Sequence, residues 1–114
     1  MPYISVNTSE KVSDAQKEKI KSELGRIITL IPTKTEANTL IDISDSRSIY
    51  KGGEKVMGAF IELRLFHKFE FDDKKKFAEE TFEMLSRELG LKKENMYLNV
   101  FELENWGSTG TYKK

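Results

Sequence analysis

The sequence contains no cysteine and only one histidine, His67, among its 114 residues. The absence of cysteine excludes disulfides, thiol catalysis and thiolate metal sites, and a single histidine excludes a histidine cluster for zinc. The apolar runs are short and interrupted, so no segment is predicted to span a membrane. The first residues, MPYISVNTSE, lack the basic and apolar regions of a secretory signal, and we therefore expect a cytoplasmic protein.

Neither positive nor negative charge is in excess. Nineteen basic and nineteen acidic residues give a formal net charge of +0. This balance argues against binding to nucleic acid. The length fits a single domain, which we expect to cover residues 1–114.

Alternating apolar and polar residues predict four strands, at residues 3–7, 39–44, 58–66 and 95–102. Two further segments are irregular in pattern. Residues 44–55 are predicted to form a turn-rich loop around a Gly-Gly pair, and residues 104–114 a turn-like tail with room for a short edge strand.

Two helices are predicted between these strands. Ser13 has capping-box spacing to Gln16 and is expected to start the first helix, which Pro32 stops. The second helix is predicted to begin at Asp72 and to end at Gly90, which suits the left-handed position after a helix.

The resulting order is β-α-β repeated twice, with halves 1–56 and 57–114 that resemble each other weakly at an offset of 57 positions. Such a duplication predicts an α+β fold: a four-stranded mixed sheet with both helices on one face. Outward-facing aromatic residues on the other face are too apolar to be left in water, and we infer that a homo-oligomer buries them. They are Phe60, Phe66, Tyr97 and Phe101.

Several segments, in this order and spacing, resemble the tautomerase superfamily, and most closely the branch of macrophage migration inhibitory factor and D-dopachrome tautomerase. The opening MPYISVNTS places Pro2 directly before a strand, and Lys34 follows the first helix. The segment YKGG matches the family's glycine-rich loop, and MYLNVFELENW its last strand with a Tyr-x-Asn motif. The resemblance covers nearly the whole chain.

The resemblance implies that Met1 is removed and that the exposed nitrogen of Pro2 is the catalytic base. An internal proline nitrogen is a tertiary amide without basicity, whereas a terminal proline is a rigid secondary amine. A free α-amino group titrates at about 7.7–8.0, and burial or a nearby ammonium group lowers that pKa. The amine can then be neutral near neutral pH and accept a proton.

The same resemblance implies the rest of the site and its assembly. Lys34 would bind a substrate carboxylate or carbonyl, and a neighbouring subunit of a homotrimer would contribute the residues of its last strand. The substrate-binding residues implied are Lys34, Phe66, Tyr97, Asn99, Tyr3, Arg64 and Trp106. From the residues alone, Arg64 is as well explained by pairing with Glu62, and Asn99 by a sheet-edge role.

We therefore expect an isomerase: a tautomerase of small keto or enol acids such as phenylpyruvate that needs no cofactor and no metal. The alternative is a cytokine-like binding protein that keeps an unused pocket, recognises a protein receptor and leaves cells without a leader. Asn38 stands where the cytokine has an aromatic pocket residue, so the resemblance does not identify the substrate.

Overall fold

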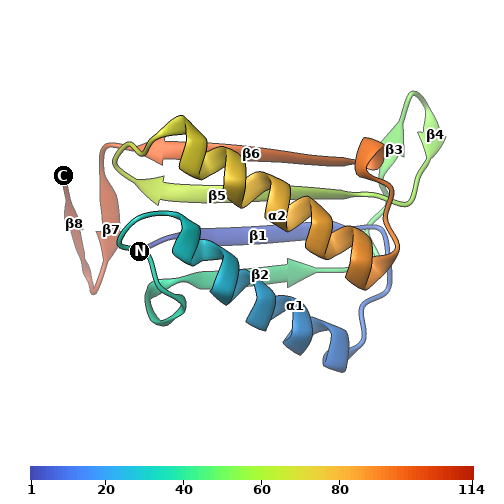
Figure 1. Ribbon diagram of the computed structural model, residues 1–114, viewed down its shortest axis with the longest axis horizontal. Helices are drawn as coiled ribbons and strands as arrows, with labels where there is room; N and C mark the ends of the chain where they lie inside the picture. The colour runs from blue at the N-terminus through green and yellow to red at the C-terminus, as the bar shows by residue number, and fades with distance from the viewer.

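The computed structural model describes residues 1–114 and contains the predicted four-stranded mixed sheet. Its strands, in the order β2-β1-β5-β6, are Leu40–Ser44, Tyr3–Thr8, Ala59–Phe66 and Met96–Leu103. The pairs β1/β2 and β5/β6 are parallel, whereas β1 and β5 are antiparallel. Both long helices cover one face of the sheet and leave the other face bare (Figure 1). The predicted α+β fold is thus confirmed.

Helix α1, Asp14–Ile27, begins with the predicted capping box. The Gln16 backbone N–H donates to the Ser13 hydroxyl at 3.1 Å, and the Ser13 N–H donates to the Gln16 side chain at 2.9 Å. These bonds satisfy amide groups that the first helical turn leaves without partners. A 3₁₀ turn, η1 (Ile28–Leu30), tightens the end of α1 before Pro32.

Helix α2, Phe71–Leu89, begins one residue earlier than predicted and ends at Gly90. Gly90 has φ of +68°, a left-handed conformation that costs a glycine little. The following Leu91 is 1% exposed and packs into the core, as the hydrophobic contact after such a cap requires.

The core lies between the helices and the inner face of the sheet. Residues of β5 alternate between buried and exposed, so Ile61, Leu63 and Leu65 are fully buried while Phe60 is 38% exposed on the bare face. Their principal partners on the helices are Ile20, Leu24, Phe77, Met84 and Leu85.

Two segments predicted to be irregular contain small hairpins. In the loop, β3 (Tyr50–Lys51) pairs with β4 (Glu54–Lys55), with positive φ at both intervening glycines, as a tight hairpin turn requires. In the tail, β7 (Trp106–Ser108) pairs with β8 (Thr111–Lys113). The tail hairpin is a separate two-stranded sheet, so it does not add an edge strand to the main sheet.

Short 3₁₀ turns, η2 (Glu36–Asn38) and η3 (Lys93–Asn95), lead into β2 and β6. None of the helices combines the length and the apolar character needed to cross a membrane.

Candidate active site

Pro2 lies at the end of the sheet where β1 and β2 begin and β5 and β6 end. It is buried, and its carbonyl oxygen accepts the Leu40 N–H at 3.0 Å. That bond fixes the residue directly before β1. The tail hairpin β7–β8 lies beside the N-terminus at the same end of the molecule (Figure 1).

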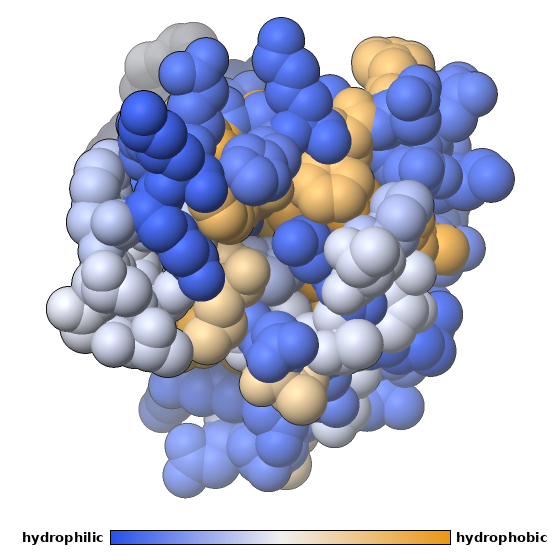
Figure 2. All heavy atoms as spheres, turned by 90° about the vertical axis from the view of Figure 1, so that its left-hand side faces the viewer, coloured by the Kyte–Doolittle hydropathy of each residue, from blue (hydrophilic) through white to orange (hydrophobic).

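A pocket of about 340 Å³ opens at this end. Its wall is made by the first three residues, by Leu40 at the start of β2, and by the first strand and turn of the tail hairpin; the residues are Met1, Pro2, Tyr3, Leu40, Trp106, Gly107, Ser108 and Thr109. Figure 2 shows this end of the molecule, where apolar side chains are exposed in the middle and hydrophilic ones surround them.

The electrostatic surroundings of the N-terminus disfavour a protonated amine. Burial lowers the pKa of the Met1 α-amino group from its ordinary value, and the positive charges of Lys34 and Lys113 lower it further. Neither lysine has a carboxylate partner in any of the nine ion pairs of the structure, so neither charge is neutralised by one. The Lys34 Nζ atom lies 5.2 Å from the centroid of the Phe69 ring.

Phe66 and Trp106 form an aromatic wall near the pocket. Their ring centroids are 6.1 Å apart, and the Phe66 ring also lies 3.7 Å from that of His67. His67 has φ of 75°, and its N–H donates to Leu103 at the end of β6. Of these two aromatic residues, Trp106 lines the pocket, whereas Phe66 contacts Trp106 without lining the pocket itself.

Tyr3 and Arg64 are neighbours on the bare face of the sheet. The Tyr3 hydroxyl donates to Asp42 Oδ2 at 2.9 Å, which raises the pKa of Tyr3. The Arg64 guanidinium lies 5.8 Å from the Tyr3 ring and is paired with Glu62 at 3.1 Å. Tyr3 therefore lines the pocket, whereas Lys34 and Arg64 lie outside its lining, and Arg64 makes the Glu62 pair that the sequence offered as its alternative role.

Within one chain, Tyr97 and Asn99 lie far from Pro2. The sheet register aligns Tyr97 with Phe60, and Phe60 with Asn7, five residues along β1 from Pro2. At about 3.3 Å per residue, this separation is roughly 16 Å along the strands. Asn99 is exposed in the middle of β6, where it aligns with Glu62.

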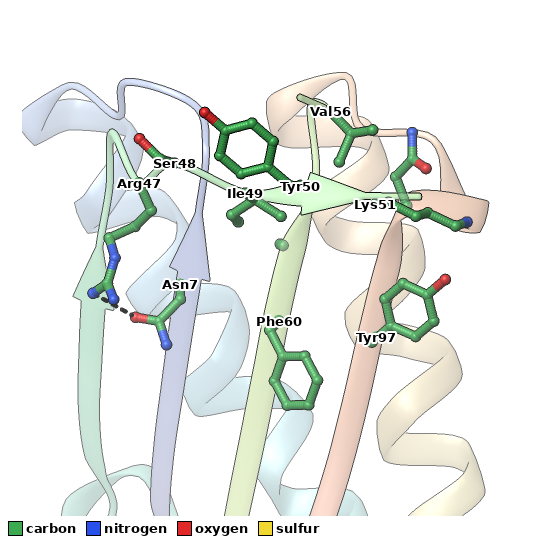
Figure 3. A pocket seen from close by; sticks show the side chains of 11 residues that line it. Asn7, Arg47, Ser48, Ile49, Tyr50, Lys51, Val56, Phe60 and Tyr97 are labelled. Atoms are coloured by element: carbon green, nitrogen blue, oxygen red, sulfur yellow. Dashed lines mark hydrogen bonds between the residues drawn. The ribbon is translucent and has the colours of Figure 1, made fainter. Parts of the chain in front are cut away.

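Tyr97 instead lines a second hollow, of about 410 Å³, at the opposite end of the sheet. Figure 3 shows Phe60 and Tyr97 projecting from β5 and β6 beneath the segment that carries β3. Arg47 Nη1 donates to Asn7 Oδ1 at 3.5 Å there, and Lys51 Nζ lies 5.4 Å from the Tyr97 ring centroid. Each chain therefore carries one pocket around Pro2 and a distant one that contains Tyr97.

Sequence reasoning missed Leu40 in the lining of the Pro2 pocket, and it missed Lys113, which is outside that lining but whose charge acts on the N-terminal amine. The predicted second strand was expected to begin near Leu40, but nothing in the pattern placed its first residue against Pro2. Lys113 could be found only from the hairpin register, which pairs it with Trp106. Nowhere do three or more histidine, aspartate or glutamate side chains gather as they would to hold a metal ion.

The arrangement defines a β-α-β-β-α-β domain with a buried proline directly before its first strand. The sequence matches the macrophage migration inhibitory factor (MIF) family over residues 1–112, and the chain belongs to that family. A search among curated proteins finds no match.

Solved structures of the same fold include MIF2 of Leishmania major and a MIF-like protein of Entamoeba histolytica. The Leishmania protein is 19% identical with a TM-score of 0.90, and 98% of this chain and 97% of that one are covered. The Entamoeba protein is 20% identical with a TM-score of 0.85 and 97% coverage of both chains. A further structure is of Pt0534 inactivated by 2-oxo-3-pentynoate, at 10% identity, a TM-score of 0.83, and coverage of 95% of this chain and 92% of that one.

Proposed function

We propose that the protein is a cofactor-free keto–enol tautomerase of small 2-keto acids, with the amine of Pro2 as the general base after removal of Met1. The observation that carries the proposal is the position of Pro2, buried at the head of β1 in a pocket beside the cation of Lys34. Membership of the MIF family supports the same activity.

The surroundings suit an amine that must be neutral to act. Removal of Met1 moves the free amine by one residue, into the position of the buried Pro2 nitrogen. Burial and the two lysine charges that lower the pKa of the Met1 amine then act on the new terminus in the same direction. The neutral amine takes the hydroxyl proton of the enol acid and returns a proton to the carbon next to the carbonyl, which yields the keto acid.

Binding groups for such an acid are available around this nitrogen. Lys34, whose charge acts on the terminal amine, would supply a cation for the carboxylate. Trp106, which lines the pocket, and the neighbouring Phe66 would supply an apolar wall for an aryl or alkyl group. In our proposal, Tyr97 and Asn99 join the site from a neighbouring subunit of a homotrimer. The bare sheet face supports the assembly, because Phe60, Tyr97 and Phe101 are each 38–49% exposed on it.

The direct test is the loss of the enol absorbance of phenylpyruvate, followed with three proteins. The chain without Met1 should accelerate ketonisation, and Pro2→Gly should reduce kcat/KM by about a hundredfold, the contribution of a positioned general base. The chain that retains Met1 should be inactive, because its proline nitrogen is an amide. Equal rates for all three would rule out Pro2 as the base.

A covalent probe identifies the nucleophilic nitrogen independently of turnover. Pt0534, which shares the fold, was inactivated by 2-oxo-3-pentynoate, a keto acid whose triple bond is conjugated to its carbonyl group. Addition of the neutral Pro2 amine would form an N–C bond at the far alkyne carbon, while the near carbon gains the amine proton. Intact mass should show one equivalent of reagent on the processed chain, located at Pro2, and none on the chain with Met1. Binding of phenylpyruvate without turnover or labelling would favour the binding-protein alternative.

A further inference from the structure

A second cation, beyond the residues that the family resemblance supplies, acts on the N-terminal amine of the proposed tautomerase site. Lys113 lies on β8, the last strand of the chain, and pairs with Trp106 across the tail hairpin. Residues that lie directly opposite each other in an antiparallel pair project their side chains from the same face. Lys113 therefore projects from the face that carries the Trp106 ring, and Trp106 lines the Pro2 pocket.

We propose that Lys113 is a second anion-binding group of the Pro2 pocket and that the site consequently favours small keto acids with two carboxylates. This inference rests on the proposed tautomerase function and specifies its substrate class. One carboxylate would be held by Lys34 and the other by Lys113, with the reacting carbons between them and next to the Pro2 nitrogen.

Three features of the hairpin support this role. First, the turn of the hairpin forms part of the pocket wall through Gly107, Ser108 and Thr109, so the hairpin is fixed against the N-terminus. Second, Lys113 is close enough for its charge to act on the N-terminal amine, as Lys34 does. Third, Lys113 belongs to no ion pair, although eight other lysine or arginine residues are paired with carboxylates.

Two unpaired cations that both act on the N-terminal amine also repel each other, and a dianionic ligand relieves that repulsion more completely than a monoanion. A substrate with an apolar group in place of its second carboxylate would leave Lys113 without a partner. The cation of Lys113 therefore favours a substrate that carries a second negative charge.

The next residue provides a matched control. Lys114 carries the same charge, but it lines a different hollow together with His67, Lys68 and Glu102. Lys113→Gln and Lys114→Gln change the net charge equally, so a general electrostatic effect would appear in both variants. Lys113→Arg retains the cation and should preserve the selectivity.

The experiment compares KM values of the processed protein for oxaloacetate, which has two carboxylates, and phenylpyruvate, which has one. Lys113→Gln should raise the KM for oxaloacetate about threefold to fivefold, as expected for a partly solvent-exposed ion pair, and should change that for phenylpyruvate by less than about twofold. Lys114→Gln should change neither. The inference is overturned if the two variants shift both KM values alike, or if Lys113→Gln leaves the ratio unchanged.

Calorimetric titration with malonate separates this inference from the catalytic proposal. Malonate should bind the wild-type protein and Pro2→Gly, and should bind Lys113→Gln more weakly than Lys114→Gln by the same factor as in kinetics. Loss of selective malonate binding would contradict the role of Lys113 even in an active enzyme. Selective binding together with equal enol turnover by wild type and Pro2→Gly would contradict the catalytic proposal and leave the second anion site supported.

Discussion

At the residue scale, the chemistry of the pocket depends on how Lys34 acts on the terminal amine. Its positive charge disfavours the protonated amine and so lowers the amine pKa. Lys34→Gln should therefore raise the pKa of the processed Pro2 amine. Because the base acts only when it is neutral, the acid limb of the pH profile of kcat/KM should move to higher pH. Lys34→Arg, which retains the charge, should keep the limb near its wild-type position.

The same variant should also weaken binding of the acid. Loss of a charge-assisted hydrogen bond is expected to raise KM roughly tenfold. Lys55→Gln on β4, in the other hairpin, is the control for a change in net charge and should alter neither the pH profile nor KM. An acid limb that stays in place in Lys34→Gln would show that Lys34 does not tune the base.

At the element scale, Glu102 near the end of β6 holds the loop between β5 and α2. Its carboxylate accepts the Phe69 N–H at 2.7 Å and pairs with Lys74 at 3.0 Å, contacts that lower the pKa of Glu102. The ring of Phe69, whose backbone Glu102 holds, is also the aromatic contact of the Lys34 ammonium.

Glu102→Gln should destabilise the fold by about 1 kcal/mol, allowing for solvent screening of a surface pair. A carboxyl group whose pKa is lowered by folding stabilises the protein above its unfolded-state pKa, about 4.3, and this contribution is lost as the pH falls through the folded-state value. In urea unfolding, the free energy of unfolding of Glu102→Gln should thus fall below that of the wild type by the whole amount at pH 7. The difference should shrink below about pH 4. Glu104→Gln, two residues further on, is the control, and a deficit independent of pH would argue against the ionic contribution of Glu102.

The elements differ in how far sequence could predict them. The capping box at Ser13 and the alternation of Ala59–Phe66 are local signals, so the start of α1 and the bounds of β5 were predicted nearly to the residue. The end of α1 was predicted at Pro32, but the helix ends at Ile27 and a 3₁₀ turn follows it. The hairpins β3–β4 and β7–β8 were not predicted, because strands of two or three residues leave too short a pattern to recognise. The positions of Pro2, Lys34 and Trp106 followed from the family resemblance, whereas Lys113 depends on a pairing register that only the structure supplies.

At the scale of the whole molecule, the distance between Pro2 and Tyr97 makes assembly a condition of activity in our proposal. The two residues lie at opposite ends of the same sheet, so one chain alone cannot place both around a small acid. Closed cyclic symmetry would repeat one contact around the ring and join each Pro2 to the Tyr97 of the next subunit. In such a ring, Pro2→Gly and Tyr97→Ala damage different halves of each shared site.

Co-refolding equal amounts of the two variants should therefore restore activity that neither has alone. With random mixing in a ring, about a quarter of the sites would combine an intact Pro2 with an intact Tyr97 from its neighbour. Phenylpyruvate ketonisation by the mixture should then approach about a quarter of the wild-type rate, after subtraction of each variant's own rate. Mixed assemblies verified by mass spectrometry that gain no activity would show that Pro2 and Tyr97 do not act across a subunit boundary. Full activity of Tyr97→Ala by itself would show that the reaction does not need Tyr97.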